Sequence, residues 1–405
     1  MNAIGLQLND RGPRMDYLQI LSILGLMAIS VAFVYSATSV NELASEVVWF
    51  KQSYFKQIIW FSIGLSAASA VCTVDYHSLT RWSMVAYGLT VASLVLVLVV
   101  GRSVYGAKRW IDLGSFQFQP SEFAKLAFIM AQASFLSRPI DELRSTRIFW
   151  KSIGMMALPF LLIMKEPDLG SALVLLPTGL VMLYAAGTPR RYILQLLGAA
   201  GLLAFLFMAE VLYAPPKFRI HMQEYQVRRL LVYFGRNYAD YFGPNAAEGE
   251  RKKFQEQQFN DSHNVRQALI AVGSGGLLGK GWRQGQQNAL GFLPQAGKHN
   301  DFIFSVIAEE KGFVGSVVVI TLYAVILFSG IRIAGQARDR LGKLLAVGVV
   351  TLIFSHVFIN IGMNIRMMPV TGVPLPLLSY GGSSVLGSLI AMGILQNIHM
   401  YRKAY

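Results

Sequence analysis

Long apolar segments recur along almost the whole chain and constrain its fold more than any other feature. Spanning a bilayer as a helix takes about 20 predominantly apolar residues. The sequence predicts ten transmembrane helices, at residues 17–37, 55–74, 82–101, 121–137, 149–165, 169–187, 191–213, 302–333, 343–363 and 377–400. We therefore expect an all-α polytopic membrane protein that forms a single domain over residues 1–405. The eighth segment is long and is interrupted at residues 309–312.

The composition also favours a membrane protein. Of the 405 residues, 54% are hydrophobic and 14% are charged, whereas a soluble domain carries about 25% charged residues. A net charge of +14 is also found in proteins that bind nucleic acid, but here the charges lie mostly between apolar segments. We interpret them as topology signals and expect no nucleic acid. Arg11 and Arg14 precede the first apolar segment, as basic residues do in a signal peptide, but this segment is too long for the apolar region of a signal peptide. The single cysteine, Cys72, excludes an intrachain disulfide.

The distribution of Lys and Arg predicts the orientation in the membrane. Short cytoplasmic segments are enriched in these residues, and placing both termini inside puts roughly twice as many of them inside as outside. We therefore expect cytoplasmic termini and a long extracytoplasmic loop over residues 214–301, before the eighth helix. Loops of this length are usually functional. The apolar run at residues 230–234 suggests that part of the loop is immersed in the membrane interface.

The loop after the third segment opposes this trend, because Arg102, Lys108 and Arg109 lie on the predicted outer side. Basic residues there work against the topology rule, so they should have another role.

The fourth segment begins with Gln119, Pro120, Ser121 and Glu122, and Lys125 follows. Proline suits the first turn of a helix, and Ser121 or Glu122 could satisfy its free amides. Glu122 and Lys125 are three residues apart and share one helix face. Ionisable groups inside a membrane are costly and usually pair or face a cavity. The two are therefore either a structural ion pair or part of a site that binds an anion together with the nearby arginine.

Two further motifs have simple structural explanations. Asp168 follows Pro167 and can cap the next helix, although it could also shape a site. The glycine-rich stretch at residues 273–281 is no Walker loop, because its Gly279-Lys280 pair is not followed by Ser or Thr. It predicts a compact loop, with a diphosphate cradle as the weaker alternative.

Asp301 stands where the long loop meets the eighth apolar segment. A carboxylate at that boundary could act on a molecule with a polar head and an apolar tail, or it could simply be the N-cap of the helix. His299 and Asp301 could share a metal, but two residues do not make a site. Glu309 and Glu310 should face a polar cavity or a cation rather than lipid. The prolines of residues 369–376 predict broken backbone, which membrane proteins tolerate only inside protein or along a cavity.

These motifs together resemble the SEDS family, the shape, elongation, division and sporulation proteins. The resemblance covers nearly the whole chain. Each motif is weak alone, and their order and spacing make the set specific. The motifs are Arg109-Trp110, Gln119-Pro120-Ser121-Glu122 with Lys125, Pro167-Asp168-Leu169-Gly170, Gly273-Ser274-Gly275-Gly276-Leu277, Asp301-Phe302-Ile303-Phe304, Pro369-Val370-Thr371-Gly372 and Ser379-Tyr380-Gly381-Gly382-Ser383.

The resemblance implies a ten-helix enzyme of the bacterial inner membrane that polymerises lipid II, a disaccharide-pentapeptide on undecaprenyl diphosphate, into glycan strands of peptidoglycan. It also implies a class B penicillin-binding protein as the transpeptidase partner, within a complex of other elongation proteins. Asp75-Tyr76 and the stretch around Trp110 favour the RodA branch, with an FtsW-like division paralogue as the alternative. The sequence departs from the family's usual pattern at Gln295, Gly297-Lys298, Asn300 and Arg366-Met367.

Asp301 falls on the essential loop aspartate of that family and is the expected general base. The substrate-binding candidates are Arg109, Gln119, Ser121, Glu122, Lys125, Asp168, Gln267, Gln287 and Ser379. Arg109 and Lys125 would neutralise the leaving diphosphate, with or without a divalent cation such as Mg²⁺ or Mn²⁺. Two other classes of function remain open, a flippase for lipid II and a non-catalytic scaffold of the cell-wall machinery.

Overall fold

Helices form most of the molecule. The computed structural model describes residues 15–44, 48–104, 107–112, 114, 117–213, 224–242, 247–289 and 300–402. Within these ranges a helix stands at each of the ten predicted places. They are α1 (Tyr17–Ala44), α2 (Ser53–Thr73), α4 (Ser83–Val100), α5 (Pro120–Leu136), α7 (Thr146–Lys165), α8 (Leu169–Ala185), α9 (Arg190–Tyr213), α14 (Ile303–Gln336), α15 (Arg340–Asn364) and α16 (Gly382–Tyr401). Shorter turns are η1 (Trp49–Lys51), α3 (Tyr76–Arg81) and α6 (Ile140–Leu143).

The apolar character of these helices makes the protein a polytopic membrane protein, as the sequence predicts. Among the described residues, seven helices are long and apolar enough to cross a membrane, and α8 is a shorter apolar helix. The seven are α1, α2, α4, α7, α9, α14 and α15. The count of ten crossings stays a prediction.

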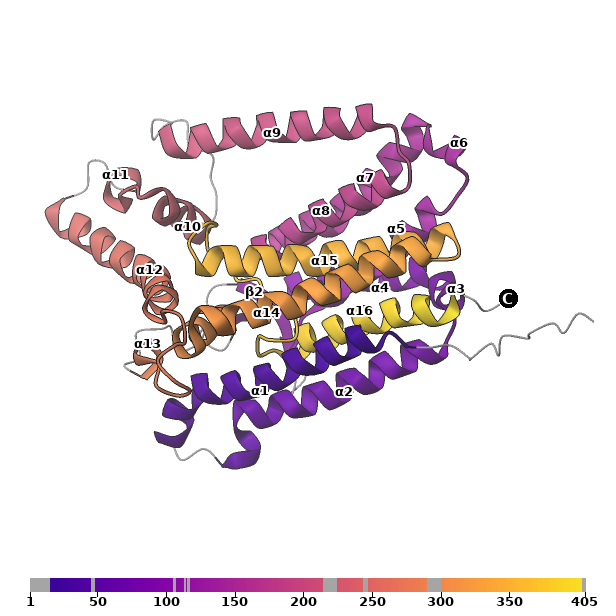
Figure 1. Cartoon of the computed structure of the whole chain (residues 1–405). Coiled ribbons are helices and arrows are strands. Elements are labelled where there is room, and N and C mark those ends of the chain that lie inside the picture. The colour runs from indigo at the N-terminus through magenta and orange to yellow at the C-terminus, as the bar shows by residue number, and fades with distance from the viewer. Residues whose placement is uncertain are drawn as a thin grey trace, which may run out of the picture.

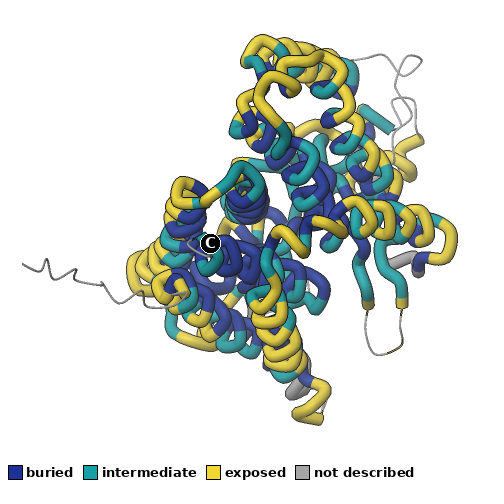
Figure 2. The backbone as a smooth tube through the Cα atoms, turned by 90° about the vertical axis from the view of Figure 1, so that its right-hand side faces the viewer, coloured by how far each residue is buried: buried dark blue, intermediate teal, exposed yellow. Residues whose placement is uncertain are grey.

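Helix α15 forms the centre of the bundle. In its most apolar stretch 67% of the residues are buried, against 6% in α9 and 17% in α2 and in α4. Figure 2 shows buried residues gathered in the middle of the bundle and exposed ones along its outer helices. Outward-facing side chains such as Leu203 and Phe205 on α9 are exposed and apolar, which is the surface that lipid tails cover.

The first and last helices meet at one end of the bundle. The backbone N–H of Asp16 donates to Oε1 of Gln396 at 3.0 Å. The carboxylate of Asp16 accepts from Ser329 and Arg332, which lie near the end of α14. Helix α14 runs along the length of the bundle (Figure 1). Asp301 stands just before the start of this 34-residue helix, so it lies at the end of the bundle opposite Asp16. The start of α1 and the end of α16 therefore lie on one side, which agrees with the even number of crossings that the sequence predicts.

The predicted long loop contains helices. They are α10 (Glu224–Phe234), α11 (Tyr238–Phe242), α12 (Glu248–Ser274) and α13 (Gln286–Ala289). We call α10, α11 and α12 the cap. Val227, Leu231 and Tyr238 form its small core, and Phe254 packs against them. Leu231 was expected in the membrane interface but is buried in this core. Phe234, at the end of the same apolar run, is exposed, so immersion of the run in the membrane interface stays a prediction.

A small sheet departs from the all-α expectation. Strands β1 (Arg102–Val104), β2 (Ala107–Asp112) and β3 (Gln117–Phe118) pair antiparallel in the order β1-β2-β3. The sheet holds the basic loop after α4 against the start of α5, because β3 leads through Gln119 directly into that helix. It thereby positions Arg109, which lies on β2.

Helix α14 is broken at Gly312, whose φ of 64° and ψ of −157° are not helical. The glycine-rich loop supplies the hydrogen bonds that the break removes. The N–H groups of Phe313 and Val314 donate to Gly276 and Leu277, at 2.9 and 3.1 Å. In the other direction, residues 280 and 281 donate to the carbonyls of residues 309 and 310, each at 3.0 Å. Backbone freed at membrane depth is tolerated when protein satisfies it in this way.

The glycines of this loop are required by close packing. A Cβ at Gly275 would stand 1.9 Å from the carbonyl oxygen of Ala308, and one at Gly279 would stand 2.2 Å from that of Glu310. The compact-loop interpretation therefore accounts for them. The neighbouring Glu309 pairs with Lys280 at 2.7 Å, and Glu310 accepts from Ser36 and from the backbone N–H of Arg283. Both acidic side chains therefore face polar groups rather than lipid, as expected.

Residues 365–381, which we call the re-entrant segment, join α15 to α16 without a helix. His356 lies eight residues before the end of α15, about 12 Å along the helix, and its Nδ1 is 3.3 Å from the carbonyl oxygen of Pro374. The segment therefore turns back into the bundle, and its Val373 and Leu375 are buried. The predicted broken backbone is confirmed, and the last helix begins at Gly382 rather than at residue 377.

Candidate functional site

Asp301 lies just before α14, but it is not the N-cap. The helix begins at Ile303, its N-cap is Phe302, and no side chain caps it. The capping interpretation of Asp301 is therefore wrong. The local rule fails here because tertiary contacts hold the residue in another conformation.

Buried asparagines on α15 fix the backbone of Asp301. The side-chain amides of Asn360 and Asn364 donate to its carbonyl oxygen at 3.1 and 3.0 Å. Ser379 donates to the preceding carbonyl, that of Asn300, at 2.6 Å. Both asparagines are fully buried. Neither asparagine is among the predicted site residues. Two amides four residues apart in an apolar span are nevertheless a usable signal, because polar groups at that depth are costly.

The carboxylate of Asp301 lies against the re-entrant segment and among charged groups. A Cβ at Gly372 would be 3.6 Å from its Oδ2. Burial raises the pKa of Asp301 to about 6, while Arg229 and Arg109 act to lower it and Asp168 acts to raise it. A carboxylate with a pKa close to the working pH is suited to act as a general base.

Arg109 reaches from β2 to the turn between α7 and α8. Its Nε donates to the carbonyl of Glu166 at 3.3 Å, and its guanidinium also donates to the carbonyl of Pro167. Its other terminal nitrogen is 4.0 Å from the carboxylate of Asp168. The two backbone carbonyls hold the guanidinium in one orientation without neutralising its charge.

Asp168 caps α8 and also contacts the residue before α5. One oxygen caps α8 by accepting from the N–H of Ser171 at 3.1 Å. The other accepts from the amide of Gln119 at 3.2 Å, and that amide also donates to Ser121 at 3.1 Å. Pro120 opens α5 as predicted, but the helix has no side-chain cap, so the expected capping by Ser121 or Glu122 is wrong. The fold thus brings Gln119 and Ser121 to the Arg109–Asp168 pair.

Glu166 also belongs to this cluster, although it is not among the predicted site residues. It is fully buried, and among the described residues neither of its carboxylate oxygens has a hydrogen-bond partner. Burial raises its pKa to about 9, Asp168 raises it further, and Arg109 opposes the shift. The side chain is therefore a neutral acid at pH 7. No sequence signal separates it from an exposed turn residue.

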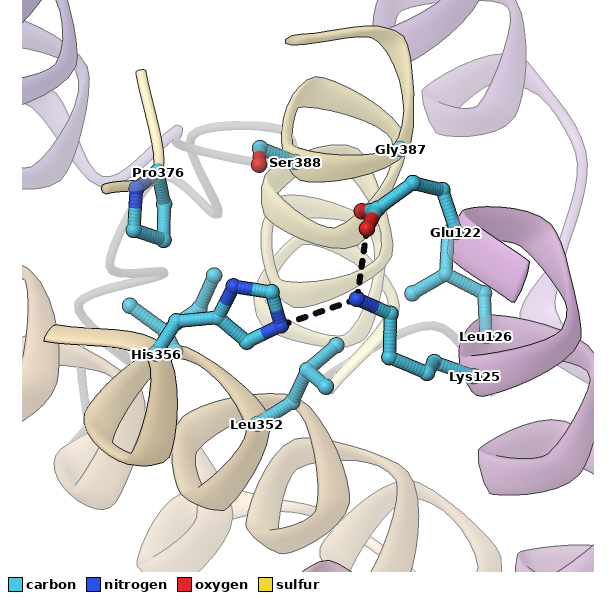
Figure 3. Close-up of a pocket in the computed structure, with 9 residues that line it drawn as sticks. Glu122, Lys125, Leu126, Leu352, His356, Pro376, Gly387 and Ser388 are labelled. Atoms are coloured by element: carbon cyan, nitrogen blue, oxygen red, sulfur yellow. Dashed lines mark hydrogen bonds and ion pairs between the residues drawn. The ribbon is translucent and has the colours of Figure 1, made fainter. Parts of the chain in front are cut away.

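Glu122 and Lys125 form the predicted ion pair in a cavity between α5, α15 and α16 (Figure 3). Lys125 Nζ is 2.7 Å from Glu122 Oε1 and 3.0 Å from His356 Nε2. A carbonyl can only accept, so the Pro374 contact places the histidine proton on Nδ1. His356 Nε2 then accepts from the lysine, and the imidazole is neutral.

One polar face of α15 joins this cavity to Asp301. His356, Asn360 and Asn364 follow at intervals of four residues, so they lie on the same side of the helix. The first contacts Lys125, and the other two contact the backbone of Asp301. The two polar centres therefore share one structural support.

Gln267 and Gln287 make their described contacts outside this cluster. Gln267 bonds to His263 on α12 at 3.2 Å, and the backbone N–H of Gln287 donates to Glu309 at 3.0 Å. Their role in substrate binding stays a prediction. Other predicted features lie outside the described residues, namely His299, the changes at Gln295 and Gly297-Lys298, and the side chains of Arg102 and Lys108.

A metal site made by protein ligands alone does not occur in the described part of the chain. No three His, Cys, Asp or Glu side chains come together there. Mg²⁺ is often held by one or two carboxylates plus substrate phosphates, so the predicted divalent cation would depend on the substrate.

Comparison with known proteins gives matches over almost the whole chain. Residues 16–404 match the model of a family described as cell cycle proteins, FtsW/RodA/SpoVE. The chain is 36% identical to stage V sporulation protein E of Bacillus subtilis, over 96% of this chain and 98% of that protein. It is 32% identical to the peptidoglycan glycosyltransferase MrdB of Escherichia coli, over 93% of each.

A similar chain occurs in a solved structure described as the structural coordination of polymerization and crosslinking by a peptidoglycan synthase complex. The TM-score is 0.75 and the identity 26%, over 96% of this chain and 99% of that one. Sequence, motifs and architecture agree with one another. The chain belongs to the FtsW/RodA/SpoVE family of cell cycle proteins, the SEDS family that its motifs indicate.

Proposed function

We propose that this protein is a peptidoglycan glycosyltransferase that polymerises lipid II, with Asp301 as its general base. The observation that carries the proposal is the setting of Asp301, a carboxylate with a pKa of about 6 that lies within the fields of Arg109 and Arg229. A base beside fixed cations suits a reaction in which a hydroxyl loses a proton and an anionic group departs. The relative MrdB is named a peptidoglycan glycosyltransferase.

In the proposed reaction an acceptor sugar hydroxyl attacks the anomeric carbon of the donor. Asp301 takes the hydroxyl proton as the new glycosidic bond forms. The bond from the anomeric carbon to the diphosphate oxygen breaks, and undecaprenyl diphosphate leaves with the electron pair. A single displacement of this kind inverts the anomeric centre, by analogy with inverting glycoside hydrolysis.

Arg109 stabilises the leaving diphosphate in this scheme. Two backbone carbonyls hold its guanidinium in place before substrate binds, so little reorganisation is needed as charge develops. Gln119 and Ser121 would bind the head group beside it, and Ser379 would keep the backbone next to Asp301 in position. Lys125 and Glu122 would line the adjoining part of the substrate site. A Mg²⁺ or Mn²⁺ ion could be recruited with the diphosphate, and a chelator control tests this.

The cellular setting is also a proposal. We assign the protein to the bacterial inner membrane, with both termini in the cytoplasm and Asp301 on the extracytoplasmic face. A class B penicillin-binding protein would crosslink the strands, and the role would be in cell elongation. Depletion should then give round cells, whereas a division role would give filaments.

Purified protein with fluorescent lipid II tests the proposal. Wild-type protein should give glycan chains on a gel, and Asp301→Asn should give none while it elutes as a folded monodisperse protein. Asp240→Asn is a matched control, because this exposed cap aspartate pairs with Arg251 rather than with the site. Normal chains from Asp301→Asn would contradict the assignment. Movement of labelled lipid II across vesicles without polymerisation would favour a flippase.

A further inference from the structure

Helix α10 of the cap turns two different faces to its surroundings. Val227 and Leu231, four residues apart, are buried in the core of the cap. Arg229 and Tyr233, also four apart, share another face, because two residues correspond to a rotation of about 200°. The apolar face explains why the helix forms. The Arg229 face has a different partner.

That partner is the re-entrant segment. The hydroxyl of Tyr233 donates to the carbonyl of Met367 at 2.9 Å. The same segment holds Gly372 against the carboxylate of Asp301. Helix α10 is therefore seated with its Arg229 face toward the segment that lines the site. The charge of Arg229 also acts on Asp301.

The neighbouring Arg228 makes its described contacts within the cap. Its guanidinium donates to Gln257 on α12 at 3.0 Å and lies 3.9 Å from Asp261. One residue further along, Arg229 lies about 100° away around the helix. The two adjacent arginines therefore lie on different sides of α10, and Arg228 is the one directed at α12.

We propose that Arg229 binds the diphosphate of the lipid-linked substrate, as a second guanidinium that the cap places beside Asp301. The proposal rests on the proposed function, because that function supplies the diphosphate. Arg109 comes from the sheet and Arg229 from the cap, so the two reach the anion from independent elements. Arginine suits this role because its planar donors match phosphate oxygens in pairs.

Binding of farnesyl diphosphate tests this without any turnover, because that probe has a diphosphate and a short isoprenoid tail but no sugar. Titration of full-length protein in detergent should show at least about tenfold weaker binding for Arg229→Gln, the effect of one lost charge-assisted hydrogen bond. The affinity of Arg229→Lys for the probe should lie between those of wild type and Arg229→Gln, because lysine keeps the charge but loses the paired geometry. Arg251→Gln should bind like wild type, because Arg251 is an exposed cap residue paired with Asp240.

Farnesol and inorganic pyrophosphate identify what Arg229 recognises. Farnesol should bind wild type and Arg229→Gln equally. If Arg229→Gln weakens the binding of farnesol as much as that of farnesyl diphosphate, the substitution acts through the fold, and the proposal is overturned. Displacement of farnesyl diphosphate by equimolar pyrophosphate would assign the site to a free anion instead of a lipid.

Unchanged binding of farnesyl diphosphate by Arg229→Gln would refute the inference, whatever the result for Asp301. Asp301→Asn measured in parallel keeps the two proposals separate. That variant should bind the probe at least as tightly as wild type, because it removes a negative charge from the site. If it still polymerises lipid II, the proposed base fails, while the binding results for Arg229 retain their meaning.

Discussion

Replacing Lys125 with methionine tests how strongly the buried ion pair stabilises the bundle. The side chains of Lys125 and Glu122 are 1% and 5% exposed and are 2.7 Å apart. Removing one partner of a buried pair leaves an uncompensated charge and typically costs about 3–5 kcal/mol of unfolding free energy. Lys125→Met should therefore be strongly destabilised.

The double variant Glu122→Leu/Lys125→Met removes both charges. Replacing a buried pair with apolar residues of similar volume is often neutral or stabilising. One loss remains, because His356 Nε2 no longer has a donor, and an unsatisfied buried acceptor costs about 1–3 kcal/mol. The double variant should thus be more stable than the Lys125→Met single variant, although it carries one more substitution.

Thermal unfolding in detergent measures both variants. Cys72 is the one cysteine of the chain and is half-buried, so a thiol-reactive dye reports its exposure on unfolding. Melting of Lys125→Met at the wild-type temperature would refute the reasoning. An assay of polymerisation by the double variant then distinguishes a substrate-binding role of the Glu122–Lys125 pair from a structural one. A stable, inactive double variant supports a substrate-binding role, and a stable, active one makes the pair structural.

Three further predictions follow from the site and the glycine-rich loop. The pKa of Asp301 is raised from 3.8 to about 6, so polymerisation should rise between pH 5 and 7. The neutral carboxyl group contributes stability that is fully present below pH 3.8 and is lost as pH rises through about 6. At pH 7.5 the free energy of unfolding of Asp301→Asn should therefore exceed that of wild type by up to about 3 kcal/mol. Equal free energies of unfolding would contradict this. The pKa of Glu166 is raised from 4.5 to about 9, so wild type should lose stability as pH rises across that window. Glu166→Gln should keep its activity, and its unfolding free energy should no longer fall between about pH 6 and 9, where Asp301 no longer contributes; a fall as steep as that of wild type there would contradict the assignment. Gly279→Ala should lower the free energy of unfolding by more than about 2 kcal/mol, because its Cβ would stand 2.2 Å from a backbone oxygen. Gly276→Ala has open space and a φ of 57°, so it should lower that free energy by only about 1 kcal/mol. Similar melting temperatures for the two variants would count against the packing argument.

Local patterns predicted what depends on local physics. Each apolar segment became a helix, because the backbone must satisfy its own hydrogen bonds in lipid. Glu122 and Lys125 pair because a spacing of three residues places them together on any helix. Asp168 caps α8 for the same local reason.

Contacts between distant parts of the chain escaped the sequence analysis. Arg109 meets the carbonyls of residues 166 and 167, and Asn360 meets Asp301 across 59 positions. No local rule pairs such residues. The N-cap rule even favoured the wrong role for Asp301. The glycine-rich loop was ambiguous in sequence because glycine serves ligand binding and close packing equally well, and only the distances to α14 favour packing.

His356 offers a test of whether the polar face of α15 transfers protons or only holds side chains. It accepts from Lys125 and donates to the carbonyl of Pro374. Glutamine has one acceptor and one donor group at its end and can make both contacts. His356→Gln should therefore retain polymerisation, while His356→Leu leaves the lysine and the carbonyl without this partner and should lose stability by about 1.5–3 kcal/mol, the value of a hydrogen bond to a charged group.

The comparison of these two variants decides between chemistry and support. If the imidazole only bridges Lys125 and the re-entrant segment, activity follows stability, and Gln rescues both. If the ring carries protons to or from Lys125, Gln preserves the melting temperature yet abolishes polymerisation, because an amide does not titrate. The second outcome would refute the bridging role. It would also extend the reacting system from Asp301 along α15 into the Glu122–Lys125 cavity.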